Sequence, residues 1–380
     1  MSDGNVVRPT GVEPRMSKYL HSRGTKLGLP ISGTFELTSR CNFNCRMCYV
    51  HGQNSAELER QELTAAEWLK IAQDAGKAGM MFLLLTGGEP FIRKDFCEIY
   101  TELVKMGMIV SINTNASLYN DEIRALFNKY PPSRINVTLY GGSEETYKSL
   151  CGNASYEKVV NNLRSMKNDG LQVRLNVSLT PYNCADMGRI DEISRELSLQ
   201  AKAASYMYPP VRLGAETGTN CARFDPVTAG EVFAKWNSIR DTKEMTLERA
   251  RKIKEKLDAG LTETCADVEQ EGVMCRAGRS SFWLTWDGRM IPCGTMDIEA
   301  SYPLKVGFNA AWQEVLARTA AIRLPKECSA CPNRPNCGVC ASICKGETGA
   351  FDTKPAYMCA MTRSIMENTV KIADELSKEQ

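Results

Sequence analysis

The sequence predicts an α/β protein: an open, partial barrel followed by a cysteine-rich C-terminal region. From residue 31 to about 208, short β-rich runs alternate with amphipathic helical windows, as in repeated parallel βα units. Three closely spaced cysteines follow the first of these runs. A second group of cysteines extends from Cys265 to Cys359, so two metal-binding regions are expected.

Six strands are expected, which is two short of a closed eightfold barrel. The barrel should therefore be open, with its site at the C-terminal ends of the strands. The expected strands cover residues 31–38, 81–85, 108–113, 134–139, 172–179 and 201–208.

Apolar residues at helical spacing predict helices between these strands. Trp68 and Ala72 share one helical face, and Thr64 with Glu67 forms a capping pair at its start. A second helical face ends at Gly107. Further helices are expected near 123–127, 159–166, 190–197 and 364–376.

The chain has 380 residues and a formal net charge of +2, with basic and acidic residues interspersed. This pattern predicts neither a nucleic-acid partner nor a membrane partner. No run approaches the roughly 20 apolar residues of a membrane helix, and no signal-peptide pattern opens the chain, so a cytoplasmic location is expected. Sixteen cysteines in such a chain favour metal ligation over disulfides.

Changes in pattern along the chain predict five segments. These are an N-terminal lead-in at 1–30, the barrel at 31–208, a connecting segment at 209–264, the cysteine-rich domain at 265–363 and a C-terminal helix at 364–380.

The first motif is Cys41-x3-Cys45-x2-Cys48, a spacing that folds one short loop around a single metal cluster. A four-iron four-sulfur cluster normally takes four thiolates, so three leave one iron open to a ligand from outside the protein. The alternative is zinc, whose structural sites are closed by a fourth Cys or His. His51 is the only histidine near this loop.

The second motif, Gly87-Gly88-Glu89-Pro90, leaves the end of the second expected strand, so both motifs open onto one face. Together the two motifs resemble the radical S-adenosylmethionine superfamily. The resemblance implies that the open iron chelates the amino and carboxylate groups of the cofactor. An electron from the cluster then yields a 5'-deoxyadenosyl radical, which abstracts hydrogen from the substrate.

The resemblance also implies the residues that contact S-adenosylmethionine. Tyr49 would line the adenine end, and Asn113 or Asn115 would face the ribose. The complete set is Tyr49, Gly87, Gly88, Glu89, Pro90, Asn113, Asn115, Thr138 and Asn176. Within it, Thr138 and Asn176 are candidates for contact with the cofactor or the substrate, and the alternative for Glu89 is that it only orients the loop. The chain departs from the pattern at Met47, where many relatives have an aromatic residue, and at 149–152, which lacks the arginine that often holds the cofactor carboxylate.

The C-terminal cysteines closely resemble the SPASM extension of that superfamily, which binds two auxiliary clusters. The resemblance assigns an outer cluster to Cys328, Cys331, Cys337 and Cys359, and an inner cluster to Cys275, Cys293 and Cys340. A β-turn at 286–289 would bring Cys275 and Cys293 together. Cys344 is the alternative to Cys340 as an inner ligand, and Cys265 is the candidate for the fourth inner ligand. For the whole region, the alternative is a zinc-binding module.

Two residues are candidates for catalysis outside the clusters. Cys221, in a Gly/Thr-rich loop after the sixth expected strand, is a candidate to return a hydrogen atom to a substrate radical. Asp297, just after Cys293, is a candidate base. The alternative for Cys221 is a thiol that only packs against its neighbours, and the alternative for Asp297 is a solvated surface carboxylate.

The expected function is modification of a peptide or small protein by a radical enzyme with S-adenosylmethionine and three [4Fe-4S] clusters. An electron donor such as flavodoxin or ferredoxin is expected. Because about thirty residues precede the first expected strand, leader capture is assigned to a separate protein or another surface. The alternatives are a small-molecule dehydrogenase of the same superfamily and a non-catalytic iron–sulfur or zinc protein.

Overall fold

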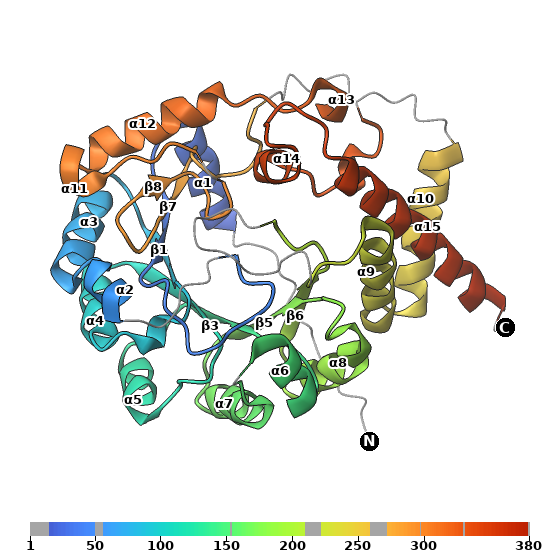
Figure 1. Cartoon of the computed structure of the whole chain (residues 1–380), viewed down its shortest axis with the longest axis horizontal. Helices are drawn as coiled ribbons and strands as arrows, with labels where there is room; N and C mark the ends of the chain where they lie inside the picture. The colour runs from blue at the N-terminus through green and yellow to red at the C-terminus, as the bar shows by residue number, and fades with distance from the viewer. Residues whose placement is uncertain are drawn as a thin grey trace.

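The computed structural model describes residues 15–49, 56–152, 154–209, 222–258, 272–296, 298–329 and 331–378. Its centre is one curved sheet, with strands in the order β6-β5-β4-β3-β2-β1-β7-β8. Figure 1 shows helices around the outside of the curve and the C-terminal helices at its open side. The predicted α/β fold with a partial barrel is confirmed.

The first six strands pair in parallel in chain order, as the sequence predicts. Their bounds are β1 (Ser32–Glu36), β2 (Phe82–Thr86), β3 (Ile109–Thr114), β4 (Arg134–Thr138), β5 (Val173–Ser178) and β6 (Gln200–Ala204).

The expectation of a six-stranded sheet is wrong in its extent, because a C-terminal hairpin lengthens the sheet. Strand β7 (Ser281–Leu284) lies parallel to β1, and β8 (Met290–Ile291) runs antiparallel to β7. The expected turn joins them, with Thr285 N–H donating to Arg289 C=O at 2.9 Å and Gly288 at φ +85°. Both strands are too short to show a clear period of two in the sequence.

Helices between the strands cover the convex face of the sheet. The expected capping box of α3 is present, since Thr64 and Glu67 bond each other's backbone N–H groups. Trp68, Tyr100 and Phe127 are fully buried between these helices and the sheet. The helices and 3-10 turns are α1 (Arg15–Leu27), α2 (Ala56–Gln61), α3 (Ala65–Lys77), η1 (Pro90–Ile92), α4 (Phe96–Lys105), α5 (Asp121–Lys129), α6 (Glu144–Cys151), α7 (Tyr156–Asn168), η2 (Cys184–Asp186) and α8 (Met187–Glu196).

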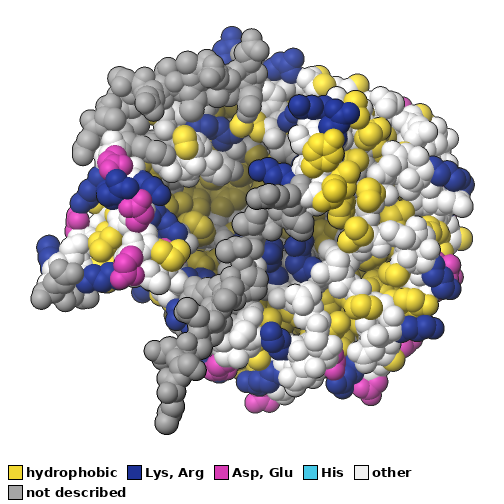
Figure 2. All heavy atoms as spheres, turned by 180° about the vertical axis from the view of Figure 1, so that it is seen from behind, with side chains coloured by type: hydrophobic (Ala, Val, Ile, Leu, Met, Phe, Trp, Pro, Cys, Tyr) yellow, Lys and Arg dark blue, Asp and Glu magenta, His cyan; other side chains and the backbone are white. Residues whose placement is uncertain are grey.

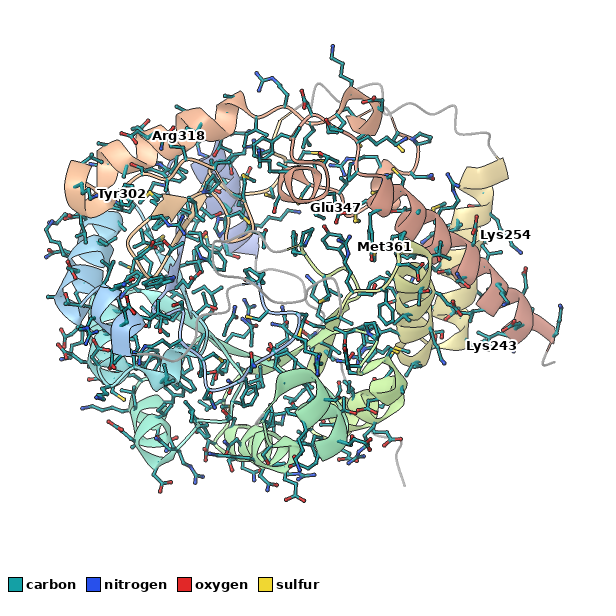
Figure 3. The ribbon with its side chains drawn as sticks, in the orientation of Figure 1. Lys243, Lys254, Tyr302, Arg318, Glu347 and Met361 are labelled. Atoms are coloured by element: carbon teal, nitrogen blue, oxygen red, sulfur yellow. The ribbon has the colours of Figure 1, made fainter. Side chains whose placement is uncertain are left out.

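Three long helices pack together beyond β6. Helices α9 (Pro226–Arg240) and α10 (Lys243–Asp258) lie beside α15 (Ala356–Lys378). Lys254, labelled in Figure 3, forms an ion pair with Asp374 at 2.7 Å. The described part of the connecting segment at 209–264 is thus more regular than expected. The closing helix also begins earlier than expected, and Cys359 lies in its first turn.

The remaining C-terminal elements are one 14-residue helix and four short elements. They are α11 (Pro303–Val306), α12 (Phe308–Ala321), α13 (Lys326–Ser329), η3 (Arg334–Asn336) and α14 (Ala341–Thr348). Of the short elements, α13 and α14 each contain a cysteine. Within the described residues, no helix combines the length and apolar character needed to cross a bilayer.

Candidate functional site

The two glycines after β2 let the loops at the ends of β1 and β2 touch. Gly88 N–H donates to Thr38 C=O at 2.8 Å, and Glu89 N–H donates to Arg40 C=O at 2.9 Å. A Cβ atom at Gly88 would lie 2.2 Å from the Arg40 carbonyl oxygen, and one at Gly87 would lie 2.5 Å from that of Thr38. The close approach of these two loops therefore requires glycine at both positions.

Glu89 joins the ends of β2 and β3. Its buried carboxylate accepts hydrogen bonds from Thr114 Oγ1 at 2.8 Å, Asn115 N–H at 2.7 Å and Phe91 N–H at 3.2 Å. Burial raises the pKa of Glu89 to about 7, against these hydrogen bonds, which lower it. The Glu89 carboxylate therefore holds the ends of β2 and β3 together through hydrogen bonds to groups of the protein.

The cysteine loop is fixed on its other side by the C-terminus of α6. Asn44 N–H donates to Cys151 C=O and Arg46 N–H donates to Leu150 C=O, both at 3.0 Å. Both acceptor carbonyl groups belong to the stretch 149–152, which lacks the arginine that would hold the cofactor carboxylate.

Cys41, Cys45 and Cys48 lie close enough to influence one another's ionisation. Burial, followed by the charge of Glu89, raises the pKa of the Cys41 thiol well above its usual range, and the other two thiols raise it further. Asn115 Nδ2 lies 3.8 Å from Cys41 Sγ. A metal cluster bound by these thiols would favour the thiolate form. Three soft sulfur donors on one loop therefore fit an iron–sulfur cluster.

A buried ion-pair network, which sequence reasoning missed, supports the start of this loop. Arg40 donates to both carboxylate oxygens of Glu62 at 2.9 Å. Arg93 donates to Glu62 at 3.3 Å and to Leu37 C=O at 2.9 Å. The sequence feature that could have indicated this network is an arginine soon after each of the first two strands.

The expected cofactor residues on later strands face the concave side of the sheet. Asn113 donates to Thr86 Oγ1 at 3.5 Å and accepts from Asn136 Nδ2 at 2.8 Å. Thr138 and Asn176 are register partners on β4 and β5. Tyr49 is partly exposed beside Cys48. Asn136 was missed, although it alternates with apolar residues along β4.

The four cysteines expected to hold the outer cluster line one cavity of about 100 Å³, although Cys328 and Cys359 are far apart in the chain. Burial raises the pKa of the Cys328 thiol, and Cys359, Cys337 and Cys331 raise it further. This donor set fits a cluster with four thiolates.

Two of the expected inner ligands, Cys275 and Cys293, line a second cavity of about 580 Å³ beside Trp283. Burial raises the pKa of the Cys340 thiol, and both of these cysteines raise it further. Cys344 is fully buried in the apolar core between the two groups. Of the two candidate thiols, Cys340 rather than Cys344 is thus the one whose pKa is raised by the inner pair.

Three expected residues, Cys221, Cys265 and Asp297, lie outside the described residues, so their assignments stay predictions. Within the described residues, no three His, Cys, Asp or Glu side chains converge on the position of a single metal ion, and this holds for the three cysteine groups as well. The outer cysteines and two of the inner ones instead line cavities.

An aromatic cluster that was not predicted connects β6 with the C-terminal region. Glu347 on α14, labelled in Figure 3, accepts from Tyr206 Oη and Arg223 Nη2, both at 2.5 Å. The Arg223 guanidinium lies 3.7 Å from the centre of the Tyr357 ring. Tyr208 lies near Cys340 and Cys293, and its pKa is raised, chiefly by burial.

Comparison with known sequences gives a family match for the barrel. Residues 35–183 match the radical SAM superfamily. The chain is 22% identical over 341 residues to the AdoMet-dependent heme synthase of Methanosarcina barkeri, covering 85% of this chain and 94% of that protein. It is 27% identical over 259 residues to a probable GTP 3',8-cyclase of Metallosphaera sedula, covering 68% of this chain and 78% of that protein.

Comparison with solved structures shows the same fold over most of the chain. Streptococcus suis SuiB bound to precursor peptide SuiA matches with a TM-score of 0.64 and 14% identity, covering 94% of this chain and 84% of SuiB. Native anSMEcpe with bound AdoMet and Cp18Cys peptide matches with a TM-score of 0.61 and 13% identity, covering 92% of this chain and 100% of that chain.

Proposed function

We propose that the chain is a radical SAM enzyme, as the match of residues 35–183 to that superfamily supports, and that it cleaves S-adenosylmethionine reductively and removes a hydrogen atom from a peptide or protein substrate. The observation that carries this proposal is the loop of Cys41, Cys45 and Cys48 at the C-terminal ends of the strands. Three thiolates would hold a [4Fe-4S] cluster and leave one iron for the cofactor.

When bound, the reduced cluster and S-adenosylmethionine supply an electron transfer that yields methionine and a 5'-deoxyadenosyl radical. The chain's own residues position these groups. The backbone bonds at Gly88 and Glu89 hold the cysteine loop against β2, and Glu89 fixes Asn115 next to Cys41. Tyr49, Asn113, Thr138 and Asn176 are proposed to line the cofactor.

The C-terminal cysteines are proposed to hold two auxiliary [4Fe-4S] clusters in a SPASM-type domain. Cys328, Cys331, Cys337 and Cys359 would hold the outer cluster, and Cys275, Cys293 and Cys340 the inner one, with Cys265 as a candidate fourth ligand. A flavodoxin or ferredoxin would supply electrons, and a separate protein is proposed to capture a substrate leader.

A peptide substrate is supported by the whole-chain fold likeness to SuiB and anSMEcpe, whose structures hold peptides. The second candidate is a small anionic molecule. It is supported by two arginines on the concave face of the sheet, Arg134 and Arg174, and by relatives named as a heme synthase and a GTP cyclase.

The test is formation of 5'-deoxyadenosine from S-adenosylmethionine with dithionite, without oxygen. We expect product from the reconstituted wild type and none from Cys45→Ala, because loss of one thiolate disrupts the cluster. Cys97→Ala, on α4 away from the loop, is the matched control and should behave as wild type. Equal product from Cys45→Ala and wild type would contradict the proposal.

Mass spectrometry of short peptides encoded beside the gene tests the substrate class. A consistent loss of two mass units indicates oxidation or crosslinking. An unchanged mass with one deuterium gained in heavy water indicates epimerisation. Unmodified peptides, together with turnover of a small molecule, would favour the second candidate.

A further inference from the structure

Strands β4 and β5 are apolar on one face and polar on the other. Ile135, Val137, Leu175 and Val177 are buried against the helices. Parallel strands are usually apolar on both faces, and closed barrels are filled with branched side chains. The opposite, concave face carries Arg134, Asn136, Thr138, Arg174, Asn176 and Ser178. This face is therefore suited to water or a polar ligand.

The polar side chains form a row across neighbouring strands. Thr86, Asn113 and Asn136 are joined by hydrogen bonds of 3.5 and 2.8 Å. The next strand places Arg174 in register with Asn136. Arg174 in turn donates to Gln200 on β6 at 3.1 Å. The row thus ends on a neutral amide, which accepts a hydrogen bond from a guanidinium.

Positive charge is concentrated at this end of the row. Arg134 lies close to Arg174: burial lowers the pKa of Arg134, and the charge of Arg174 lowers it further. Lys202 follows on β6, on the same face as Gln200. Among the ion pairs of the described residues, neither arginine has a carboxylate partner.

The acidic residue on the concave face of strands β1–β6 lies away from the two arginines. On the described strands β1–β6, the concave positions carry one acidic residue, Glu36, which accepts from Trp283 Nε1 at 2.9 Å. It thus lies on β1, with three strands between it and β5. Seen from behind, the molecule is hollowed near its centre, and Lys and Arg side chains gather beside the hollow (Figure 2).

We propose that Arg134 and Arg174, beside Asn136, form a recognition site for an anionic group of the substrate, a carboxylate or a phosphate. Two neighbouring like charges without a counter-ion are unfavourable, so an anion that binds both relieves this cost. The planar guanidinium also matches either oxyanion with two parallel hydrogen bonds. The assignment of this anion to the substrate rests on the function proposed above, which places the substrate in the barrel.

The experiment is calorimetric titration of the anaerobically reconstituted holoenzyme with malonate and, separately, with pyrophosphate. We expect saturable binding of at least one probe. Arg134→Met and Arg174→Met should each weaken binding at least tenfold, and Arg174→Lys should restore part of it. Arg164→Met is the matched control, because Arg164 is exposed on α7, where it donates to Asn161 of the same helix. Tighter malonate binding identifies a carboxylate, and tighter pyrophosphate binding identifies a phosphate.

S-adenosylmethionine affinity is measured in wild type, Arg174→Met and Arg164→Met, and substrate-independent deoxyadenosine formation should be unchanged in Arg164→Met. The proposal is overturned if neither probe binds wild type, or if both Met variants bind the probes as wild type does. It is also overturned if Arg174→Met loses S-adenosylmethionine binding, since the anion would then be the cofactor carboxylate. If malonate or pyrophosphate binds but wild type forms no deoxyadenosine, the proposed function fails and the anion site stands.

Discussion

The two cysteine regions bring together similar donors by different means. Cys41, Cys45 and Cys48 belong to one loop, whose backbone is bonded to the β2 end and to α6. The C-terminal cysteines come from loops before and after the β7–β8 hairpin, from α13 and the loop after it, and from the first turn of α15. The first site depends on close contact between rigid strand ends, whereas the second depends on tertiary packing of short elements. We therefore expect metal to contribute more to folding of the C-terminal region.

The sharpest way to test this contrast is to remove one thiol from the outer group. Cys337→Ser should lose up to about four of about twelve irons, because serine is a harder and poorer ligand for cluster iron than the thiolate that it replaces. Cys344→Ser, at a fully buried position between the two groups, should keep its iron. Iron and acid-labile sulfide analysis measures both. If Cys344→Ser loses a cluster and Cys337→Ser does not, the ligand grouping is wrong.

The strand-end contact of the first region should be sensitive to a single methyl group. Gly88→Ala places a Cβ atom 2.2 Å from the Arg40 carbonyl oxygen, so we expect a loss of about 1–3 kcal/mol in unfolding free energy. Urea unfolding measures this loss.

Gly188→Ala is the matched control for this substitution. Gly188 lies within α8 (Met187–Glu196), and a Cβ atom added there would meet no neighbouring atom within 4 Å, so alanine should be neutral or slightly stabilising. Equal effects at Gly88 and Gly188 would show that the loops do not need to approach so closely.

A smaller effect is expected at the carboxylate that joins β2 to β3. Glu89→Gln replaces one acceptor oxygen with an amide donor that faces the donors of Thr114, Asn115 or Phe91. The cost should be about 1–3 kcal/mol, at the lower end if the side chain shifts to pair its oxygen. Thermal unfolding measures this cost. Glu98→Gln, at an exposed position on α4, should change stability by less than about 0.5 kcal/mol.

The sequence predicts the barrel strands well because alternating strands and helices leave a local pattern. It does not predict that β7 continues the sheet, since a four-residue strand has little periodicity and its partner β1 is distant in the chain. Likewise, the spacing of Cys41, Cys45 and Cys48 is a local signal, but the outer cysteines are brought together by packing that spacing alone does not encode.

The row of polar residues on the concave face could have been predicted from the local sequence, although it was not. Polar and apolar residues alternate along β4 and β5, from Arg134 to Thr138 and from Arg174 to Ser178. In a parallel barrel this alternation indicates a hydrated or ligand-binding interior. The buried pairing of Arg40 and Arg93 with Glu62 had a weaker signal, because it depends on where three separate loops meet.

The most direct test of the central claim is an iron, sulfide and zinc count on anaerobically reconstituted wild type and on the triple variant Cys41→Ala, Cys45→Ala, Cys48→Ala. Three clusters predict about twelve irons in the wild type and about eight in the variant, with no zinc in either. Deoxyadenosine formation should be lost with the same four irons. Zinc in place of iron, or an unchanged iron count in the triple variant, would contradict the account.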